Sequence, residues 1–482
     1  MNYRMSAYLL GQIILIVAGF LFVPFILTFA YSETGTQLAF GVTIAAMAAV
    51  GLPFVIKKPK DTTIHARGGF LTVALAWIIL SLFGAMPFAI SGYASYIDGL
   101  FEIVSGFTTT GATIFVEIES LPYSLLFWRS FSHWIGGMGV LVFVIAVLPK
   151  TNTAIVHLAK AEIPGPQFGK LVSKLRFTAR ILYGIYIILT LVEVVALLIC
   201  RMPVFDSFIT AFSTAGTGGF SSLNASIGGY NSLAIEIVTM VFMLLFSVNM
   251  NVFYLIMIGR VKQAFKNEEL WWLFGIVFVA IALVTASLMM NKVYSSFGET
   301  LRYSSYQVIA FVSTTGFGTA NFDNWPVLAQ STLFVCMFIG GMAGSTAGGL
   351  KISRVMLLAK ASGRAIKKSV SPRTVVSVKV NKKPVEENMV KNVVVYFVLI
   401  MIIYFISVIL VSIEQNAVDF PTAVTAVATC LNNVGPGLSK VAGGFAEIGV
   451  FAKIVFIFDM LIGRLEIYPI LLLFYSKAWK RV

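Results

Sequence analysis

The chain has 482 residues, of which 58% are hydrophobic and 12% charged, and its mean hydropathy is +0.90. A soluble domain is about half apolar and a quarter charged, so this composition excludes a protein that covers its surface with polar groups. The net charge of +14 would suit a nucleic-acid binder. Its basic residues are divided among separate connections between apolar runs, however, and we exclude nucleic acid as a partner.

The apolar runs, in chain order, are each about as long as a membrane-spanning helix. The first could be mistaken for a secretory signal, but it is too long for one and no A-x-A cleavage site follows it. We therefore predict an all-α polytopic membrane protein with about ten transmembrane helices in contact with lipid. The predicted spans are 8–30, 37–56, 70–91, 127–149, 181–200, 233–258, 271–290, 327–350, 393–413 and 448–475.

Lysine and arginine gather at the two termini and in alternate connections between these runs, which together hold 28 of the 35 basic residues. Basic loops stay on the cytoplasmic side of a membrane. We therefore expect both termini and the connections 57–67, 150–180, 260–266 and 351–391 to be cytoplasmic. The last of these contains eleven basic residues, and we expect it to contact anionic lipid or to dock a cytosolic partner.

The opposite connections are long and poor in basic residues, and each holds a short apolar segment followed by a glycine-containing motif. Aligned on one glycine, the motifs recur at intervals of 105, 100 and 119 residues. Internal repetition of this kind determines the whole fold. The motifs are "TTTGAT" at Gly111, "STAGTGGF" at Gly216, "STTGFGTA" at Gly316 and "NNVGPG" at Gly435.

The repetition predicts four units of helix, half-helix, loop and helix around a central pore, preceded by two extra helices. The half-helices are expected near 98–108, 205–213, 303–312 and 419–430. The expected domains are 1–68 (the two N-terminal helices), 69–176, 177–266, 267–387 and 388–482 (the four repeats).

Non-helical backbone at membrane depth is tolerated where protein or a water-filled cavity surrounds it. Four such loops can place rings of backbone carbonyls around a cation, and the half-helix C-termini would add partial negative charge. The motifs contain no carboxylate, which favours a monovalent ion. The predicted filter residues are Thr109, Thr110, Gly111, Thr214, Ala215, Gly216, Thr314, Thr315, Gly316, Asn433, Val434 and Gly435.

Each motif alone would more simply be a set of small residues that lets helices pack closely. Four copies in register favour the filter instead. Acidic residues flank the motifs on the outer side, and we interpret them mainly as solvated loop charges, although they could concentrate cations. They are Asp98, Glu117, Glu119, Asp206, Asp323 and Asp419.

The segment "FIGGMAGSTAGGLKISR", residues 338–354, interrupts the predicted span 327–350. Its G-x-x-x-G spacing could be a helix-packing face, but paired glycines make a poor helix. We favour a flexible intramembrane loop beneath the filter that acts as a gate. Its expected residues are Gly340, Gly341, Gly344, Ser345, Thr346, Gly348, Gly349 and Lys351.

Arg464 lies deep within the last predicted span, where a charge is costly. It either lines the pore as an electrostatic barrier or forms a buried pair with Asp459, Glu466 or Glu193, and the sequence leaves both open. Glu102 and Arg129 are expected to form a structural ion pair. Three scattered cysteines and three histidines (Cys200, Cys336, Cys430, His65, His133 and His157) show neither disulfide nor metal spacing.

These motifs, with "LLFWRSFSHWIGGMGV" and "GRLEIYP", together resemble the Trk/Ktr/HKT superfamily of potassium transport proteins, and its bacterial TrkH/TrkG branch most of all. The resemblance covers essentially the whole chain. It implies potassium uptake across a bacterial inner membrane by a homodimer that cytosolic TrkA-like nucleotide-binding subunits regulate. It also implies that the four aligned glycines belong to the filter and that Gly340–Lys351 and Arg464 form the gate.

The second motif offers three glycines, Gly216, Gly218 and Gly219, so its register remains open. We expect K⁺ as the transported ion and no cofactor in this chain. An alternative is a secondary transporter of a small organic substrate, which would favour twofold repetition and a few polar anchors. A membrane enzyme would need clustered catalytic side chains, which the sequence does not offer.

Overall fold

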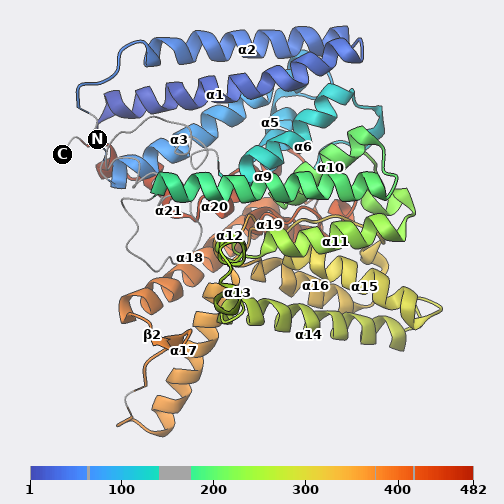
Figure 1. Ribbon diagram of the computed structural model, residues 1–482, viewed down its shortest axis with the longest axis vertical. Helices are drawn as coiled ribbons and strands as arrows, with labels where there is room; N and C mark the ends of the chain where they lie inside the picture. The colour runs from blue at the N-terminus through green and yellow to red at the C-terminus, as the bar shows by residue number, and fades with distance from the viewer. Residues whose placement is uncertain are drawn as a thin grey trace.

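The computed structural model describes residues 2–61, 64, 66–139, 175–374, 376–415 and 418–480. These residues form helices almost throughout, which confirms the all-α prediction (Figure 1). The two N-terminal helices, α1 (Tyr3–Ala30) and α2 (Thr34–Val55), pack against each other along one edge of the molecule. A short antiparallel hairpin follows α17, and each of its strands, β1 (Lys379–Val380) and β2 (Lys383–Pro384), has two residues.

The same order of elements recurs four times after α2: a long helix, a half-helix, a loop and a second helix. The first unit consists of α3 (Ala66–Gly84), α4 (Met86–Ile90), α5 (Tyr96–Phe107) and α6 (Tyr123–Gly137), and the second of α9 (Leu175–Ile199), α10 (Val204–Gly216), α11 (Leu233–Ser247), α12 (Met250–Met257) and α13 (Val261–Ala264). The third consists of α14 (Glu268–Met290), α15 (Phe297–Val312), α16 (Val327–Ile339) and α17 (Ile352–Val370). The fourth consists of α18 (Glu387–Val411), α19 (Phe420–Asn432), α20 (Val450–Arg464) and α21 (Tyr468–Phe474).

A 3₁₀ turn also recurs between the loop and the second helix of each unit. These turns are η1 (Ile118–Ser120), η2 (Ser226–Tyr230), η3 (Phe322–Asn324) and η4 (Ser439–Val441), and a fifth, η5 (Ser476–Trp479), follows α21.

Six helices in the described ranges are long and apolar enough to cross a membrane, and α11 with α12 makes a seventh, bent by 94°. The other predicted spans are interrupted. Span 327–350 stops at Ile339, and 448–475 divides into α20 and α21. Span 127–149 is described as far as residue 139, as the helix α6, and the rest of it, with most of the connection 150–180, lies outside the described residues.

The half-helices α5, α10, α15 and α19 have local reasons to start where they do. Ser95, Ser296 and Asp419 accept hydrogen bonds from backbone N–H groups in the first turns of α5, α15 and α19, as N-cap residues do. Pro203 precedes α10. All four half-helices occur near their predicted positions, with ends that differ from the prediction by up to six residues.

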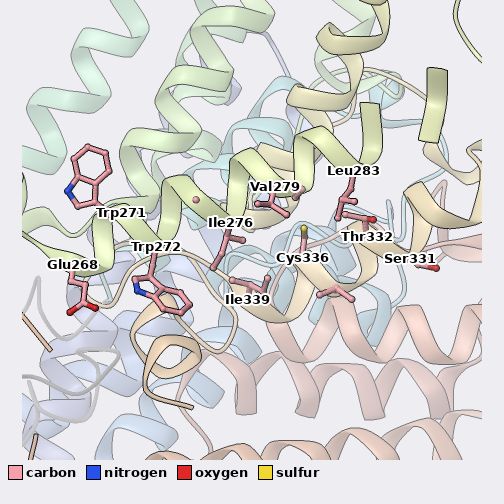
Figure 2. Close-up of a pocket in the computed structure, with 13 residues that line it drawn as sticks. Glu268, Trp271, Trp272, Ile276, Val279, Leu283, Ser331, Thr332, Cys336 and Ile339 are labelled. Carbon is pink, nitrogen blue, oxygen red and sulfur yellow. The ribbon is translucent and has the colours of Figure 1, made fainter. Parts of the chain in front are cut away.

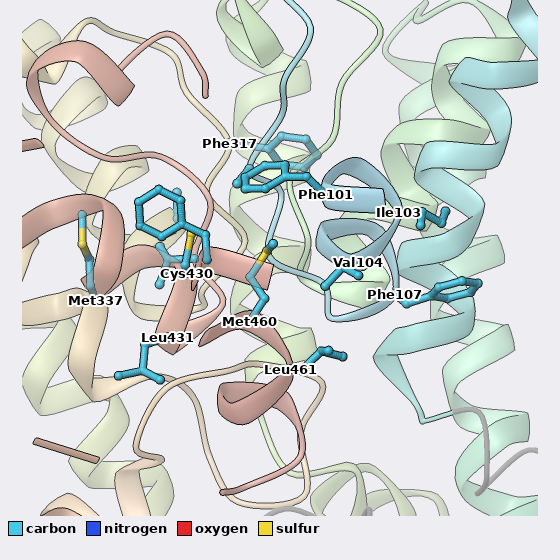
Figure 3. Close-up of a cluster of buried hydrophobic side chains, with 14 of the residues drawn as sticks. Phe101, Ile103, Val104, Phe107, Phe317, Met337, Cys430, Leu431, Met460 and Leu461 are labelled. Atoms are coloured by element: carbon cyan, nitrogen blue, oxygen red, sulfur yellow. The ribbon is translucent and has the colours of Figure 1, made fainter. Parts of the chain in front are cut away.

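The half-helices end inside the main hydrophobic core. Phe101, Val104 and Phe107 of α5 meet Leu431 of α19 and Met460 of α20 in this cluster (Figure 3). The half-helices are therefore surrounded by protein, which is the condition for placing irregular backbone at membrane depth.

Both termini lie at the same end of the helices as the basic helix α17 (Figure 1). The turn between α14 and α15 lies at the opposite end. Residues at both termini and in α17 therefore lie on one side, as the prediction requires of them, and the cytoplasmic identity of that side stays a prediction.

Cysteine labelling tests this orientation. In a Cys200→Ser background, Val370→Cys on exposed α17 should react with a membrane-impermeant maleimide after the membrane is opened, whereas the exposed control Ser295→Cys should react in intact cells. Labelling of position 370 in intact cells would overturn the assignment.

Candidate ion-conduction site

The four loops that follow the half-helices share one unusual backbone pattern. In each loop a left-handed residue, with φ between 55° and 58°, is followed two positions later by a glycine with φ between 73° and 107°. Glycine adopts such φ values without steric cost. The left-handed residues are Thr109, Thr217, Thr314 and Asn433, and the glycines, which we call the glycine ring, are Gly111, Gly219, Gly316 and Gly435.

The glycine ring holds the loops together in a closed cycle. A Cβ added to any of its members would lie 1.8 to 2.6 Å from a carbonyl oxygen of the next loop, so a side chain cannot fit there without displacing backbone. Because the fourth contact returns to the first loop, the four loops surround one axis. The contacts are Gly111 with Gly218, Gly219 with Thr315, Gly316 with Val434, and Gly435 with Thr110.

The alignment of the second loop on Gly216 is wrong. Thr214, Ala215 and Gly216 form the last turn of α10, and the loop equivalent to the other three is Thr217-Gly218-Gly219. Gly216 is needed for another reason, since a Cβ there would lie 2.4 Å from the His133 carbonyl oxygen. The T-x-G spacing of residues 217–219, which matches 109–111 and 314–316, is the sequence signal for the correct register.

Four of the predicted filter hydroxyls, those of Thr110, Thr214, Thr314 and Thr315, have protein partners. Thr110 Oγ1 lies 2.8 Å from the Thr108 hydroxyl, and Thr315 Oγ1 lies 2.9 Å from that of Ser313. In the fourth loop, Asn433 Nδ2 donates to Thr110 Oγ1 over 3.0 Å and so connects the fourth loop to the first. These side chains brace the loops, and the backbone carbonyls are left as the group that all four loops have in common.

A buried ion pair supports the first two loops from behind. Arg129 on α6 donates from Nε to Glu102 on α5 over 2.6 Å, and the two side chains are 1% and 0% exposed. Glu102 also accepts from the Ile114 N–H at 2.9 Å, while Arg129 reaches the Ser221 carbonyl at 3.4 Å. The pair that the sequence predicted therefore fixes the chain beyond Gly111 and Gly219.

The glycine-rich loop, residues 340–351, joins α16 to α17 and is not helical. The alternative of a G-x-x-x-G helix-packing face is therefore wrong. Gly340 and Gly349 have positive φ, and a Cβ on Gly349 would lie 2.8 Å from Gly340 Cα, so the two ends of the loop touch. The loop is tightly folded, and its glycines permit close approach rather than simply providing flexibility.

This loop contacts the chain just before the glycine ring. The Gly348 N–H donates to Thr314 Oγ1 at 2.7 Å, and the Gly349 N–H donates to the Asn432 carbonyl at 2.9 Å. The glycine-rich loop thus lies against the chain that leads into the third and fourth loops of the glycine ring.

The other side of the glycine-rich loop rests on the break between α11 and α12. The Met342 N–H donates to the Ser247 carbonyl at 2.9 Å, and the Gly344 carbonyl accepts from the Met250 N–H at 3.2 Å. Carbonyls at a helix C-terminus and N–H groups at an N-terminus need such partners. The bent helix and the loop therefore satisfy each other's backbone groups.

Arg464 was expected either to line the pore or to form a buried ion pair, and its side chain binds backbone carbonyls. Its guanidinium donates to the Thr346 carbonyl of the glycine-rich loop at 2.8 Å and to the Gly136 and Gly137 carbonyls at the end of α6 at 2.5 and 2.8 Å. A cation at a helix C-terminus is favourable. Of the expected partners, Glu466 instead pairs with Arg354 at 2.6 Å, so Arg464 is a bridge between the loop and α6.

Lys351, the last residue of the glycine-rich loop, is 3% exposed and donates from Nζ to the Ala347 carbonyl. It brings a second cationic side chain to the inner side of the ring.

The acidic residues outside the loops act mainly in local structure. Asp419 caps α19 and accepts from the Ser439 hydroxyl at 2.9 Å, and its hydrogen bonds with Thr422 lower the pKa of its carboxyl. Asp323 accepts from the Ser439 N–H at 2.7 Å. Asp323 and Asp419 thus have structural partners, which neither of the two interpretations, solvated loop charge or cation-concentrating charge, included.

A ring of four backbone loops inside a helical membrane protein defines a class: a transport protein with a pseudo-fourfold site, rather than an enzyme. The comparisons with known proteins agree. The family model TrkH, described as "Cation transport protein", matches residues 35–481. The chain therefore belongs to the TrkH family.

The relatives are similar over their full length. The chain is 34% identical to the Trk system potassium uptake protein TrkH of Salmonella typhimurium, over 100% of both chains, and 30% identical to TrkG of Escherichia coli K12, over 99% of both. The crystal structure of the potassium transporter TrkH from Vibrio parahaemolyticus matches with a TM-score of 0.90 and 31% identity, over 100% of both chains.

The buried pair behind the loops gives a stability prediction. Glu102→Ala should lower the free energy of unfolding by about 3–5 kcal/mol, because it leaves a buried guanidinium without its counter-charge. Thermal unfolding of the detergent-purified protein measures the effect. The control is Glu387→Ala, which removes the partner of Arg364 from an exposed Glu–Arg pair and should cause no measurable change. Equal effects of the two variants would contradict the structural role of Glu102.

Proposed function

We propose that this protein takes up K⁺ across a bacterial inner membrane through a channel-like pore whose selectivity filter is formed by residues 109–111, 217–219, 314–316 and 433–435. The observation that carries the proposal is the closed cycle of glycine–carbonyl contacts. The names of the relatives, which are potassium uptake proteins, support K⁺ as the ion.

The chemistry of the filter is that of backbone dipoles. Carbonyl oxygens from four loops replace the hydration shell of a cation, without the strong field of a carboxylate ring. The C-termini of α5, α10, α15 and α19 all end at the ring, and their partial negative charges stabilise a cation and repel an anion. The four loops differ in sequence, so the shared backbone geometry, rather than one side chain, provides the selectivity.

The glycine-rich loop is the gate of this pore. It covers the inner ends of the third and fourth filter loops through Gly348 and Gly349. Lys351 and Arg464 add positive charge on the same side, which opposes the passage of a cation. Opening requires the loop to leave its hydrogen bonds with the filter, with the α11–α12 break and with Arg464.

A cytosolic partner controls the gate through α17, whose exposed basic face continues from the loop. By the family resemblance, this partner is a TrkA-like nucleotide-binding subunit and the transporter is a homodimer. The basic connections and both termini then lie in the cytoplasm.

Substitutions within one loop test the filter. Gly316→Ala places a Cβ 2.1 Å from the Val434 carbonyl oxygen at a φ of 73°, so the preference for K⁺ over Na⁺ should fall at least severalfold. Gly219→Ala should have the same effect because Gly219 is its equivalent in the second loop. Tracer uptake of ⁸⁶Rb⁺ and ²²Na⁺ into proteoliposomes measures the preference.

Gly318→Ala is the matched control for the filter experiment, since a Cβ at Gly318 has no atom within 4 Å in the described part of the chain. Its uptake should equal that of the parent. If the Gly316→Ala and Gly219→Ala proteins fold well and keep the parental ion preference, neither glycine belongs to the filter.

Shortening the glycine-rich loop tests the gate. Removal of residues 343–347 should raise basal ⁸⁶Rb⁺ uptake per folded protein, in liposomes without any cytosolic partner, because the obstruction is gone. Arg464→Ala should raise it less, since it removes one anchor of the loop and one positive charge. Arg364→Ala, on the exposed side of the same α17, is the control. If the first two variants fold and conduct no more than the parent, the loop is not a gate.

A further inference from the structure

An open apolar groove runs between α14 and α16 on the surface of the third unit (Figure 2). Its volume is 780 Å³, within the range of about 300–1,000 Å³ that is typical of ligand sites. Because α14 is long and apolar enough to cross a membrane, the groove faces the region that lipid tails occupy. Its apolar lining includes Ile276, Val279 and Leu283 of α14, and Val335, Cys336 and Ile339 of α16.

The groove is open at Gly275, in the middle of its α14 wall. Glycine lowers the stability of a helix, yet close packing does not require it here. A Cβ added to Gly275 would have no atom within 4 Å in the described part of the chain. The space in front of Gly275 is therefore available to an apolar ligand.

Two tryptophans mark one end of the groove. Figure 2 shows Trp271 and Trp272 beside Glu268, whereas Leu283 and Thr332 lie at the other end. Trp271 Nε1 donates to the Phe265 carbonyl at 2.8 Å, in the turn that precedes α14. Tryptophan is enriched at the level of the lipid headgroups, so this end of the groove lies at the membrane surface.

The β1–β2 hairpin docks at the same end of the groove. The Asn381 N–H donates to Glu268 Oε2 at 3.0 Å, and the Glu268 N–H donates to Asn381 Oδ1 at 2.8 Å. Lys382 and Lys383 follow Asn381 in the hairpin, and both are exposed. Two cationic side chains are therefore held beside the tryptophans.

The charge at this end of the groove is positive. Glu268 is the acidic residue that lines the groove, and its carboxylate accepts a hydrogen bond from Lys360 Nζ. Lys266, two residues before Glu268, is exposed as well. Together with the two hairpin lysines, Lys266 and Lys360 outnumber the single carboxylate, so the end of the groove is complementary to an anion.

We propose that this groove binds an anionic phospholipid, with an acyl chain between α14 and α16 and the phosphate headgroup against the lysines beside Trp271 and Trp272. Basic sites between transmembrane helices at the membrane surface bind such headgroups. A second copy of the chain is a poorer occupant, because a twofold axis along the membrane normal would bring the same lysines of both copies together. The site lies outside the filter and the glycine-rich loop, and the inference does not depend on the proposed function.

The test is the affinity of the detergent-purified full chain for phosphatidylglycerol, measured by native mass spectrometry while the lipid is titrated. The parent should bind phosphatidylglycerol about tenfold more tightly than zwitterionic phosphatidylcholine. Gly275→Leu, which puts a side chain into the groove, should weaken phosphatidylglycerol binding about tenfold, the equivalent of about two buried methylene groups. The control Gly19→Leu should leave it unchanged, since Gly19 is an exposed glycine inside α1 whose added Cβ has no described atom within 4 Å.

A second pair of variants tests the headgroup end. Lys382→Gln combined with Lys383→Gln should remove most of the preference for phosphatidylglycerol over phosphatidylcholine, because these lysines attract the anionic headgroup. Lys367→Gln combined with Lys368→Gln removes the same charge from exposed positions near the end of α17 and should keep the parental preference.

Three results would overturn the inference. They are equal affinities of the parent for the two lipids, parental phosphatidylglycerol affinity in folded Gly275→Leu protein, and a lower fraction of dimer in that variant without a change in bound lipid. The last result would make the groove a contact between copies of the chain. If Gly275→Leu does not fold, the exposed Lys382 and Lys383 variant decides the question. Since no ion uptake is measured, failure of the lipid site leaves the proposed function untouched.

Discussion

The architecture depends on four positions at which no side chain fits, the glycines of the glycine ring. Each member of the glycine ring lies so close to a carbonyl oxygen of the next loop that a Cβ would overlap it, and each adopts a φ that favours glycine. No loop can move alone, because its glycine touches one neighbour and its carbonyl touches the other. The capped half-helices fix where each loop starts. The Glu102–Arg129 pair fixes where the first two loops leave the ring.

A second constraint is that irregular backbone inside a membrane must find partners. The bent pair α11–α12 and the glycine-rich loop meet this need together, through Ser247, Met250 and their partners in the loop. Arg464 binds the Thr346 carbonyl of the loop, and Glu269 on α14 accepts from the Ala343 N–H at 2.7 Å. The loop is therefore held from four sides by hydrogen bonds, each modest alone, as the proposed gate requires.

The sequence predicts the elements better than their exact register. Hydropathy locates the spans, and the repeated motifs locate the half-helices, because both signals extend over many residues. The second loop was misaligned because Gly216 and Gly219 look alike in sequence, whereas one packs against His133 in a helix and the other adopts a positive φ in a loop. The contact of Glu269 on α14 with the glycine-rich loop is not predictable, because its partner is the backbone N–H of Ala343, which carries no sequence signal.

The ring also has a seam. The chain connects the first loop to the second, the second to the third and the third to the fourth, but the fourth meets the first without a direct covalent link. Side chains and backbone close that gap, through Asn433 to Thr110 at 3.0 Å, Lys453 to Asp98 at 2.7 Å, and the Phe445 N–H to the Thr113 carbonyl at 2.7 Å. Asparagine in place of threonine in the fourth motif is thus explained by closure, because its amide reaches a hydroxyl of the first loop where a threonine side chain would be too short.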